Sequence, residues 1–97
     1  MYIVIIDVDY LRQFEGRYFV VNNNQYMKII NFLDNDRYCA YMEVIYALIS
    51  PELSAIAHST QPLLFNFNDV VKCKEISKEE FILKFAEAKE NINNIIL

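Results

Sequence analysis

The run from Tyr38 to Asn68 constrains the fold of this chain most strongly, because Glu43 and Glu52 are its only charged residues. The whole chain is 23% charged, with a formal net charge of -4, so its charges lie mainly outside this run. A long uncharged run must be covered by the rest of the fold or by another molecule. A chain of 97 residues has only a modest core with which to cover it. We therefore expect part of this run to lie at a contact surface.

Two secondary structures fit the segment RYCAYMEVIYALIS, from Arg37 to Ser50, which contains the first part of this run. As a strand it would have two apolar faces and would need cover on each side. As a helix it would present one wide apolar stripe, with Glu43 on the opposite side. Ala, Met, Leu and Glu favour a helix, and Pro51 stands where it would end. We interpret the segment as a helix.

The remaining segments alternate between the two types of pattern. β-branched and aromatic runs predict strands, and we expect the first two of these strands to pair antiparallel. Asn22, Asn23 and Asn24 predict a turn after the second strand, because asparagine tolerates left-handed backbone geometry. Apolar residues at helical spacing predict helices, and Asp7–Gly16 fits a short turn or a single helical turn that Gly16 ends. Further strands are predicted at Tyr2–Ile6, Arg17–Val21, Leu63–Phe67 and Val70–Ile76, and further helices at Gln25–Leu33, Glu52–His58 and Lys78 to about Asn93.

The C-terminal segment carries the clearest helix signal in the sequence. Ser77 and Glu80 form an S-x-x-E capping box, in which the serine accepts a hydrogen bond from the backbone three residues on. An apolar stripe then follows at helical spacing, formed by Phe81, Phe85, Ala88, Ile92 and Ile95. The apolar tail Ile95–Leu97 adds to the expected contact surface, because chain ends are usually polar. The expected fold class is α+β in a single domain, residues 1–97: a small antiparallel sheet of three to four strands packed by about four helices, the last one long and amphipathic.

Composition excludes several classes of function. A pI near 4.8 disfavours DNA and an anionic membrane surface as partners, because both require clustered basic residues. No apolar run reaches the 18 to 20 residues of a membrane span, and the N-terminal residues do not form a signal peptide. We therefore predict a cytoplasmic protein. One histidine and two distant cysteines do not match a zinc site, and no cofactor is expected.

The uncharged central run favours a non-catalytic protein that acts by binding other proteins. It would be an inhibitor or adaptor of the kind that phages and mobile elements encode, and it would also associate with itself, for example as a homodimer. Tyrosines suit such a surface, because the ring buries apolar area while the hydroxyl stays hydrated. The predicted interface residues are Tyr38, Tyr41, Met42, Ile45, Tyr46 and Ile49.

Two alternative functions come from polar residues elsewhere. Asp7 and Asp9 follow an apolar strand at i, i+2 and could hold a divalent cation for phosphotransfer or hydrolysis, although acids at a strand end more often cap a turn. Arg12, Arg17 and Arg37, together with tyrosines, could line a pocket between protomers that sequesters a small anion such as a nucleotide.

Overall fold

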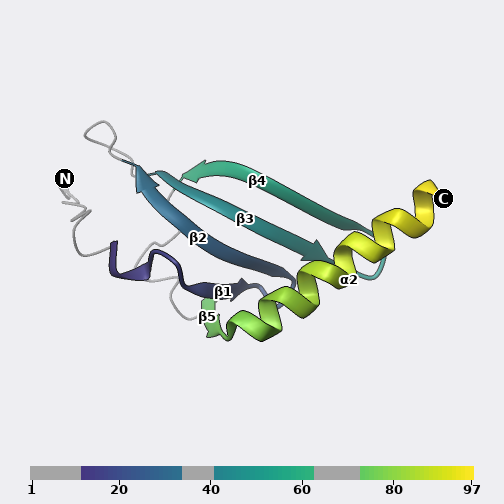
Figure 1. Ribbon diagram of the computed structural model, residues 1–97, viewed down its shortest axis with the longest axis horizontal. Coiled ribbons are helices and arrows are strands. Elements are labelled where there is room, and N and C mark those ends of the chain that lie inside the picture. The colour runs from purple at the N-terminus through teal and green to yellow at the C-terminus, as the bar shows by residue number, and fades with distance from the viewer. Residues whose placement is uncertain (1–11, 34–40, 63–72) are drawn as a thin grey trace, which may run out of the picture.

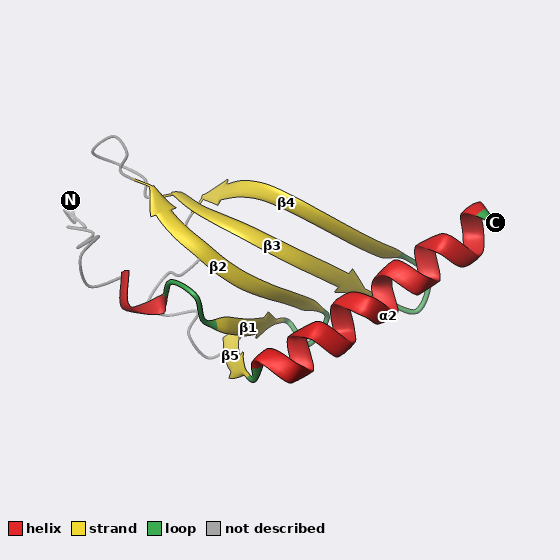
Figure 2. Ribbon diagram, in the orientation of Figure 1, coloured by secondary structure: helices red, strands yellow, loops and turns green. Residues whose placement is uncertain are grey.

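The computed structural model describes residues 12–33, 41–62 and 73–97. Their architecture is a five-stranded antiparallel sheet with one long helix lying across one of its faces (Figure 1, Figure 2). The strand order is β4-β3-β2-β1-β5, so four consecutive strands form a meander and β5 pairs with the first of them. The elements are the 3-10 turn η1 (Arg12–Phe14), the strands β1 (Tyr18–Val21), β2 (Gln25–Leu33), β3 (Tyr41–Ile49), β4 (Ser54–Pro62) and β5 (Cys73–Ile76), and the helix α2 (Lys78–Ile96).

The prediction of three to four strands packed by about four helices was wrong. In the described ranges the sheet has five strands, and α2 is the only α-helix. The broader α+β class is right. The predicted strands Tyr2–Ile6 and Leu63–Phe67 lie outside the described residues, as does the predicted pairing of the first strand.

The turn between β1 and β2 was predicted correctly. Asn22 and Asn23 have φ angles of 53° and 62°, and the N–H of Asn24 donates to the carbonyl of Val21 at 3.3 Å. Two consecutive residues with positive φ are typical of the tight hairpin turns that suit the twist of antiparallel strands. Gly16, with φ 79°, follows the 3-10 turn η1, as expected of a residue that ends a helical turn.

The second strand, β2, replaces the helix predicted at Gln25–Leu33, which was wrong. Its buried residues are Met27, Ile29 and Phe32, and the pairing with β3 shifts register between Ile29 and Asn31. This irregularity is a β-bulge, and it returns Phe32 to the same face as Ile29. The resulting spacing of two and then three residues obscures the alternation of a strand.

The opening segment of the central run forms β3, so the helix predicted there was also wrong. β3 pairs with β2 on one side and β4 on the other, so it is an inner strand of the meander. Each of its faces is at least partly covered. One face carries a buried cluster, here called the core face, and α2 packs against the other, here called the helix face. The core-face cluster consists of Phe19, Met27, Ile29, Phe32, Met42 and Val44, with Phe14, Val21, Tyr46 and Cys73 packed against it.

A tight turn at Ser50–Leu53 leads from β3 into β4, so the short helix predicted at Glu52–His58 was wrong. The hydroxyl of Ser50 accepts from the Leu53 N–H at 3.0 Å, and the Ser50 N–H donates to the Leu53 carbonyl at 2.9 Å. Pro51 stands at the second position of the turn, which its fixed φ suits. The serine therefore caps a hairpin turn and not a helix.

β5 pairs antiparallel with β1 and forms the far edge of the described sheet. It is shorter than the strand predicted at Val70–Ile76, whose first residues lie outside the described ranges. A bidentate ion pair joins the two strands: Arg17 Nε and Nη2 lie 2.7 and 2.5 Å from the carboxylate oxygens of Glu75. The hydrogen bonds from Arg17 lower the pKa of Glu75 below its ordinary value of 4.5.

The C-terminal helix was predicted correctly and is longer than expected. The hydroxyl of Ser77 accepts from the N–H of Glu80 at 3.1 Å, and Glu79 and Glu80 lie in the first turn, where acids suit the helix dipole. Phe81 and Ala88 are its buried residues. Within the described part of the chain, no helix has the length and apolar character needed to cross a membrane.

Candidate binding surface

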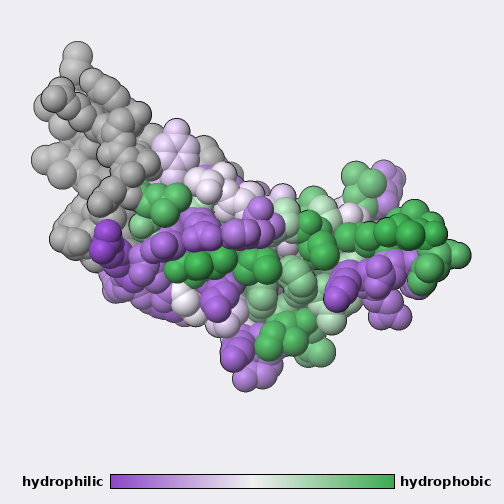
Figure 3. Space-filling model, turned by 45° about the horizontal axis from the view of Figure 1, so that its top comes forward, coloured by the Kyte–Doolittle hydropathy of each residue, from purple (hydrophilic) through white to green (hydrophobic). Residues whose placement is uncertain are grey.

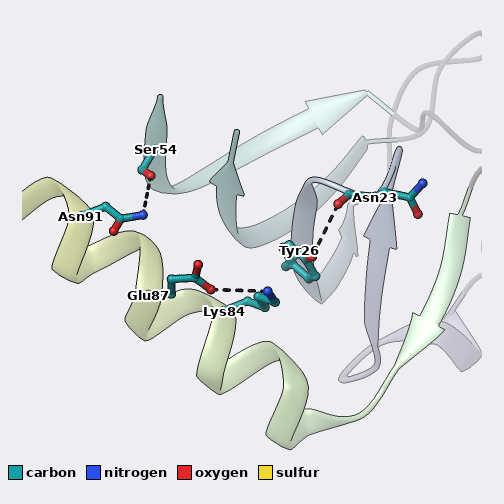
Figure 4. Close-up of polar contacts among 6 residues, drawn as sticks. All are labelled: Asn23, Tyr26, Ser54, Lys84, Glu87 and Asn91. Carbon is teal, nitrogen blue, oxygen red and sulfur yellow. Dashed lines mark hydrogen bonds and ion pairs between the residues drawn. The ribbon is translucent and has the colours of Figure 1, made fainter. Parts of the chain in front are cut away.

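α2 crosses the helix face from β1 toward β4. The Phe81 ring lies 5.2 Å from that of Tyr18 on β1, and the Lys84 ammonium lies 5.5 Å from the ring of Tyr26 on β2. Further along, the Asn91 amide donates to the hydroxyl of Ser54 on β4 at 3.1 Å. Figure 4 shows Asn91 reaching toward Ser54, and the side chain of Lys84 beside Tyr26. These contacts fix the path of the helix over the sheet.

On β2 and β4 these contacts lie at Tyr26 and Ser54, toward one end of the strands. Toward the other end, two cross-strand rows continue the helix face. The first row is Lys28–Ile45–His58, and the second is Asn31–Glu43–Thr60. His58, Asn31 and Thr60 are exposed. We call these two rows the open part of the helix face.

A groove runs between α2 and the open part of the helix face. Its volume is about 280 Å³, and its surface is mostly apolar. Ile45 forms the sheet side of the groove. The helix side has the i, i+3, i+4 spacing of a single stripe. The lining residues are Ile45, Phe81, Ile82, Phe85, Ala86 and Lys89.

Polar groups surround this apolar groove. His58 Nε2 and Glu43 Oε2 lie 2.6 Å apart on adjacent strands next to Ile45. The Lys28 ammonium lies 5.7 Å from the ring centre of Tyr18, and Lys89 lines the helix side. An apolar centre with a mixed polar rim is the usual anatomy of a protein–protein contact surface.

A second apolar feature is the end of α2. After Asn91 the helix continues past the sheet, which Figure 1 shows clearly. Ile95 is 81% exposed and Ile96 is 73% exposed. We call residues 92–97 the overhang. Figure 3 shows apolar surface gathered along this extended end of the molecule.

The predicted interface residues are divided between the two faces of β3. Met42 is buried on the core face, and Tyr46 packs against the same cluster. Tyr41, Ile45 and Ile49 alternate with them, so they lie on the helix face, and each is half-buried. Of these residues, Ile45 lines the groove. Tyr38 lies outside the described residues.

Most of the polar residues of the two alternatives lie outside the described part of the chain. Asp7, Asp9 and Arg37 lie outside it. Residues 12–33, 41–62 and 73–97 contain no group of three acidic, histidine or cysteine side chains that could hold a metal ion. Arg17 is paired with Glu75, and its guanidinium lies 4.9 Å from the ring centre of Phe14. An anionic ligand of Arg17 would have to compete with the carboxylate of Glu75.

Sequence reasoning missed the contribution of α2 to this surface. The predicted apolar stripe contained Phe81 and Phe85, but Ile82 and Leu83 lie beside it and are 51% and 71% exposed. Large apolar residues outside the buried stripe of an amphipathic helix were the available signal. The tail Ile95–Leu97 was the exception, because its apolar character already indicated a contact surface in the sequence.

Comparisons with known proteins give no relative from which a function could be transferred. No family model, no curated protein and no solved structure matches this chain.

Proposed function

We propose that this chain is a non-catalytic protein-binding module, acting as an inhibitor or adaptor, that also associates with itself. The observation that carries the proposal is the apolar groove between α2 and β3, flanked by large exposed apolar residues on the same helix. Contiguous exposed apolar surface of this kind is uncommon on small monomeric proteins and usually marks an interaction site.

The shape of the groove favours a protein over a small molecule as the partner. Its volume of about 280 Å³ lies at or below the lower limit of about 300 Å³ for typical small-molecule pockets. It is also partly open to solvent. One or two apolar side chains of a protein partner would fill it, while polar groups of the partner would meet Glu43, His58 and Lys89 at its rim.

Site-directed cross-linking tests this function. A variant with one cysteine, Ile82→Cys in a Cys39→Ser, Cys73→Ala background, is labelled with a photoactivated cross-linker and mixed with an extract of the source cells. We expect an adduct of one defined mass, corresponding to a second copy of the chain or to one other protein. The matched control is Glu90→Cys, an exposed position on the same helix that does not line the groove.

Competition shows whether the adduct is specific. Excess unlabelled native chain should abolish it, whereas excess Ile82→Glu chain should not, because a carboxylate in the groove would be desolvated without a partner. Equal labelling from both cysteine positions, or an adduct that both competitors remove equally, would refute the proposal.

A further inference from the structure

The edge strand β4 differs from the other edge of the sheet in a way that points to a specific partner. Within the described residues, β4 has a strand neighbour on one side alone, where it pairs with β3 along its full length. Building on the proposed binding function, we infer that two copies of this chain pair through β4, antiparallel and centred on His58. The overhang of each copy then packs over the β4 side of the other copy's helix face, around Thr60.

The composition of β4 supports pairing with its own copy. Its sequence, SAIAHSTQP, contains no Asp, Glu, Lys or Arg over nine residues. Edge strands of soluble proteins are normally protected from pairing by shortness, charge, proline or a bulge. β5 is protected in this way, since it has four residues and contains Lys74 and Glu75. β4 has only its terminal Pro62, and no Asp, Glu, Lys or Arg side chain of one β4 would meet its like in the other.

The symmetry of this pairing keeps equivalent faces together. A two-fold axis perpendicular to the sheet places His58 opposite His58 of the second copy, and Ser54 opposite its Pro62. Directly opposed residues of antiparallel strands point to the same face, so the two helix faces become one continuous surface. Both α2 helices then lie on the same side of a ten-stranded sheet.

The same axis gives the overhang a surface to cover. Asn91 bonds Ser54, so α2 leaves its own sheet at the Ser54 end of β4. The Pro62 end of the second copy's β4 stands opposite this point. Thr60 and Tyr41 lie close to that end on its helix face. Ile95 and Ile96 would therefore be covered by the part of the second copy that its own α2 leaves open.

The size of this contact sets the expected strength. A standard protein interface uses about 20 to 30 residues on each side, and this one would use the nine residues of β4 and the overhang. The contact is therefore small, and we expect a reversible dimer with a dissociation constant on the order of micromolar.

Sedimentation equilibrium over a range of concentrations tests the inference with two matched pairs of variants. Thr60→Lys and Asn31→Lys add the same charge at exposed positions on either side of Glu43, but only Thr60 lies on the edge strand. Ile96→Lys and Leu83→Lys replace residues of α2 that are 73% and 71% exposed, but only Ile96 lies in the overhang. Thr60→Lys and Ile96→Lys should each raise the dissociation constant at least about tenfold, because a lysine ammonium would be desolvated at the contact. The two control variants should change it less than about twofold.

A disulfide checks the register directly. Residues opposed across an antiparallel pair have Cα atoms about 4.5 to 5.5 Å apart, which lies within the range that a disulfide can bridge. His58→Cys in the Cys39→Ser, Cys73→Ala background should therefore form a cross-linked dimer under mild oxidation. Asn31→Cys, on the same face but away from the edge, should not.

Two results would overturn the inference. The native chain could stay monomeric at the highest concentration, or the control variants could raise the dissociation constant as much as Thr60→Lys and Ile96→Lys do. Circular dichroism of each variant shows whether it is folded. If Thr60→Lys does not fold, Ile96→Lys still tests the inference, because Ile96 is exposed and its replacement should not affect folding. A monomeric chain that still gives a specific adduct with another protein from position 82 would refute the dimer and retain the proposed binding function.

Discussion

Replacing Phe81 with alanine should detach α2 from the sheet more effectively than any other single change in the helix. Phe81 is 7% exposed, and its ring centre lies 5.2 Å from that of Tyr18 and 5.7 Å from that of Phe85. Removing the ring exposes on the order of 100 Å² of apolar area, worth about 2.5 kcal/mol at 25 cal/mol per Å². The cavity and the lost ring contacts raise the expected cost to about 3–5 kcal/mol. A small domain has a total stability of about 5–15 kcal/mol, so the loss would be a large part of it.

Urea unfolding followed by circular dichroism measures this loss. Phe85→Ala is the matched control, because Phe85 lies one turn along the same helix and is only half-buried. It should cost about 1–2 kcal/mol, since less apolar area is lost from a half-exposed ring. The reasoning would be refuted if Phe81→Ala cost less than about 1 kcal/mol, or if both variants lost the same free energy of unfolding.

Three further predictions concern the ends of elements and one ion pair. Ser77→Ala should lower the free energy of unfolding by about 0.5–2 kcal/mol in urea, and Ser77→Asp should restore it, because an aspartate also caps a helix N-terminus. Gly16→Ala should cost about 1–2 kcal/mol in the same assay because of its φ of 79°. Gly16→Asn should cost less, because asparagine tolerates left-handed backbone and no atom lies within 4 Å of the added Cβ. The pKa of Glu75 is lowered in the folded chain, so its contribution is present above pH 4.5 and is lost as the pH falls through the folded-state value. The urea midpoint of native protein should therefore exceed that of Glu75→Gln at pH 7 and converge with it as the pH falls through the lowered pKa of Glu75; a constant difference would contradict this.

Local signals in the sequence predicted the elements whose geometry depends on neighbouring residues. Ser77 and Glu80 marked the start of α2, and Asn22 and Asn23 marked the turn after β1, because caps and tight turns are fixed by contacts within a few residues. The strand at Arg17–Val21 was predicted for a similar reason, since its β-branched and aromatic residues favour extended backbone.

The central strands were mistaken for helices because their structure depends on distant partners. β3 is apolar on both faces, and helix-forming residues such as Ala47 and Leu48 fit a strand there only because neighbouring strands and α2 cover it. In β2 the bulge near Ile30 breaks the alternation that would have identified a strand. Neither the pairing nor the bulge can be read from the local pattern.

The candidate surface was predicted only in part for the same reason. Ile45 was named from the apolar central run, and it lines the groove. The other side of the groove comes from Ile82 and Phe85, which are brought to Ile45 by the path of α2 across the sheet. That path depends on contacts such as Phe81 with Tyr18, which link segments far apart in the sequence.

The strand order has a consequence for how the chain is made. The strands from β1 to β4 follow one another in the chain, so each can pair with the preceding strand soon after it leaves the ribosome. The ion pair of Arg17 forms later, because its partner Glu75 is synthesised 58 residues afterwards. Until the last residues emerge, the nascent meander exposes the surface that α2 will cover. A product stopped before Cys73 would keep that surface uncovered permanently, and we expect chaperones or proteases to recognise it.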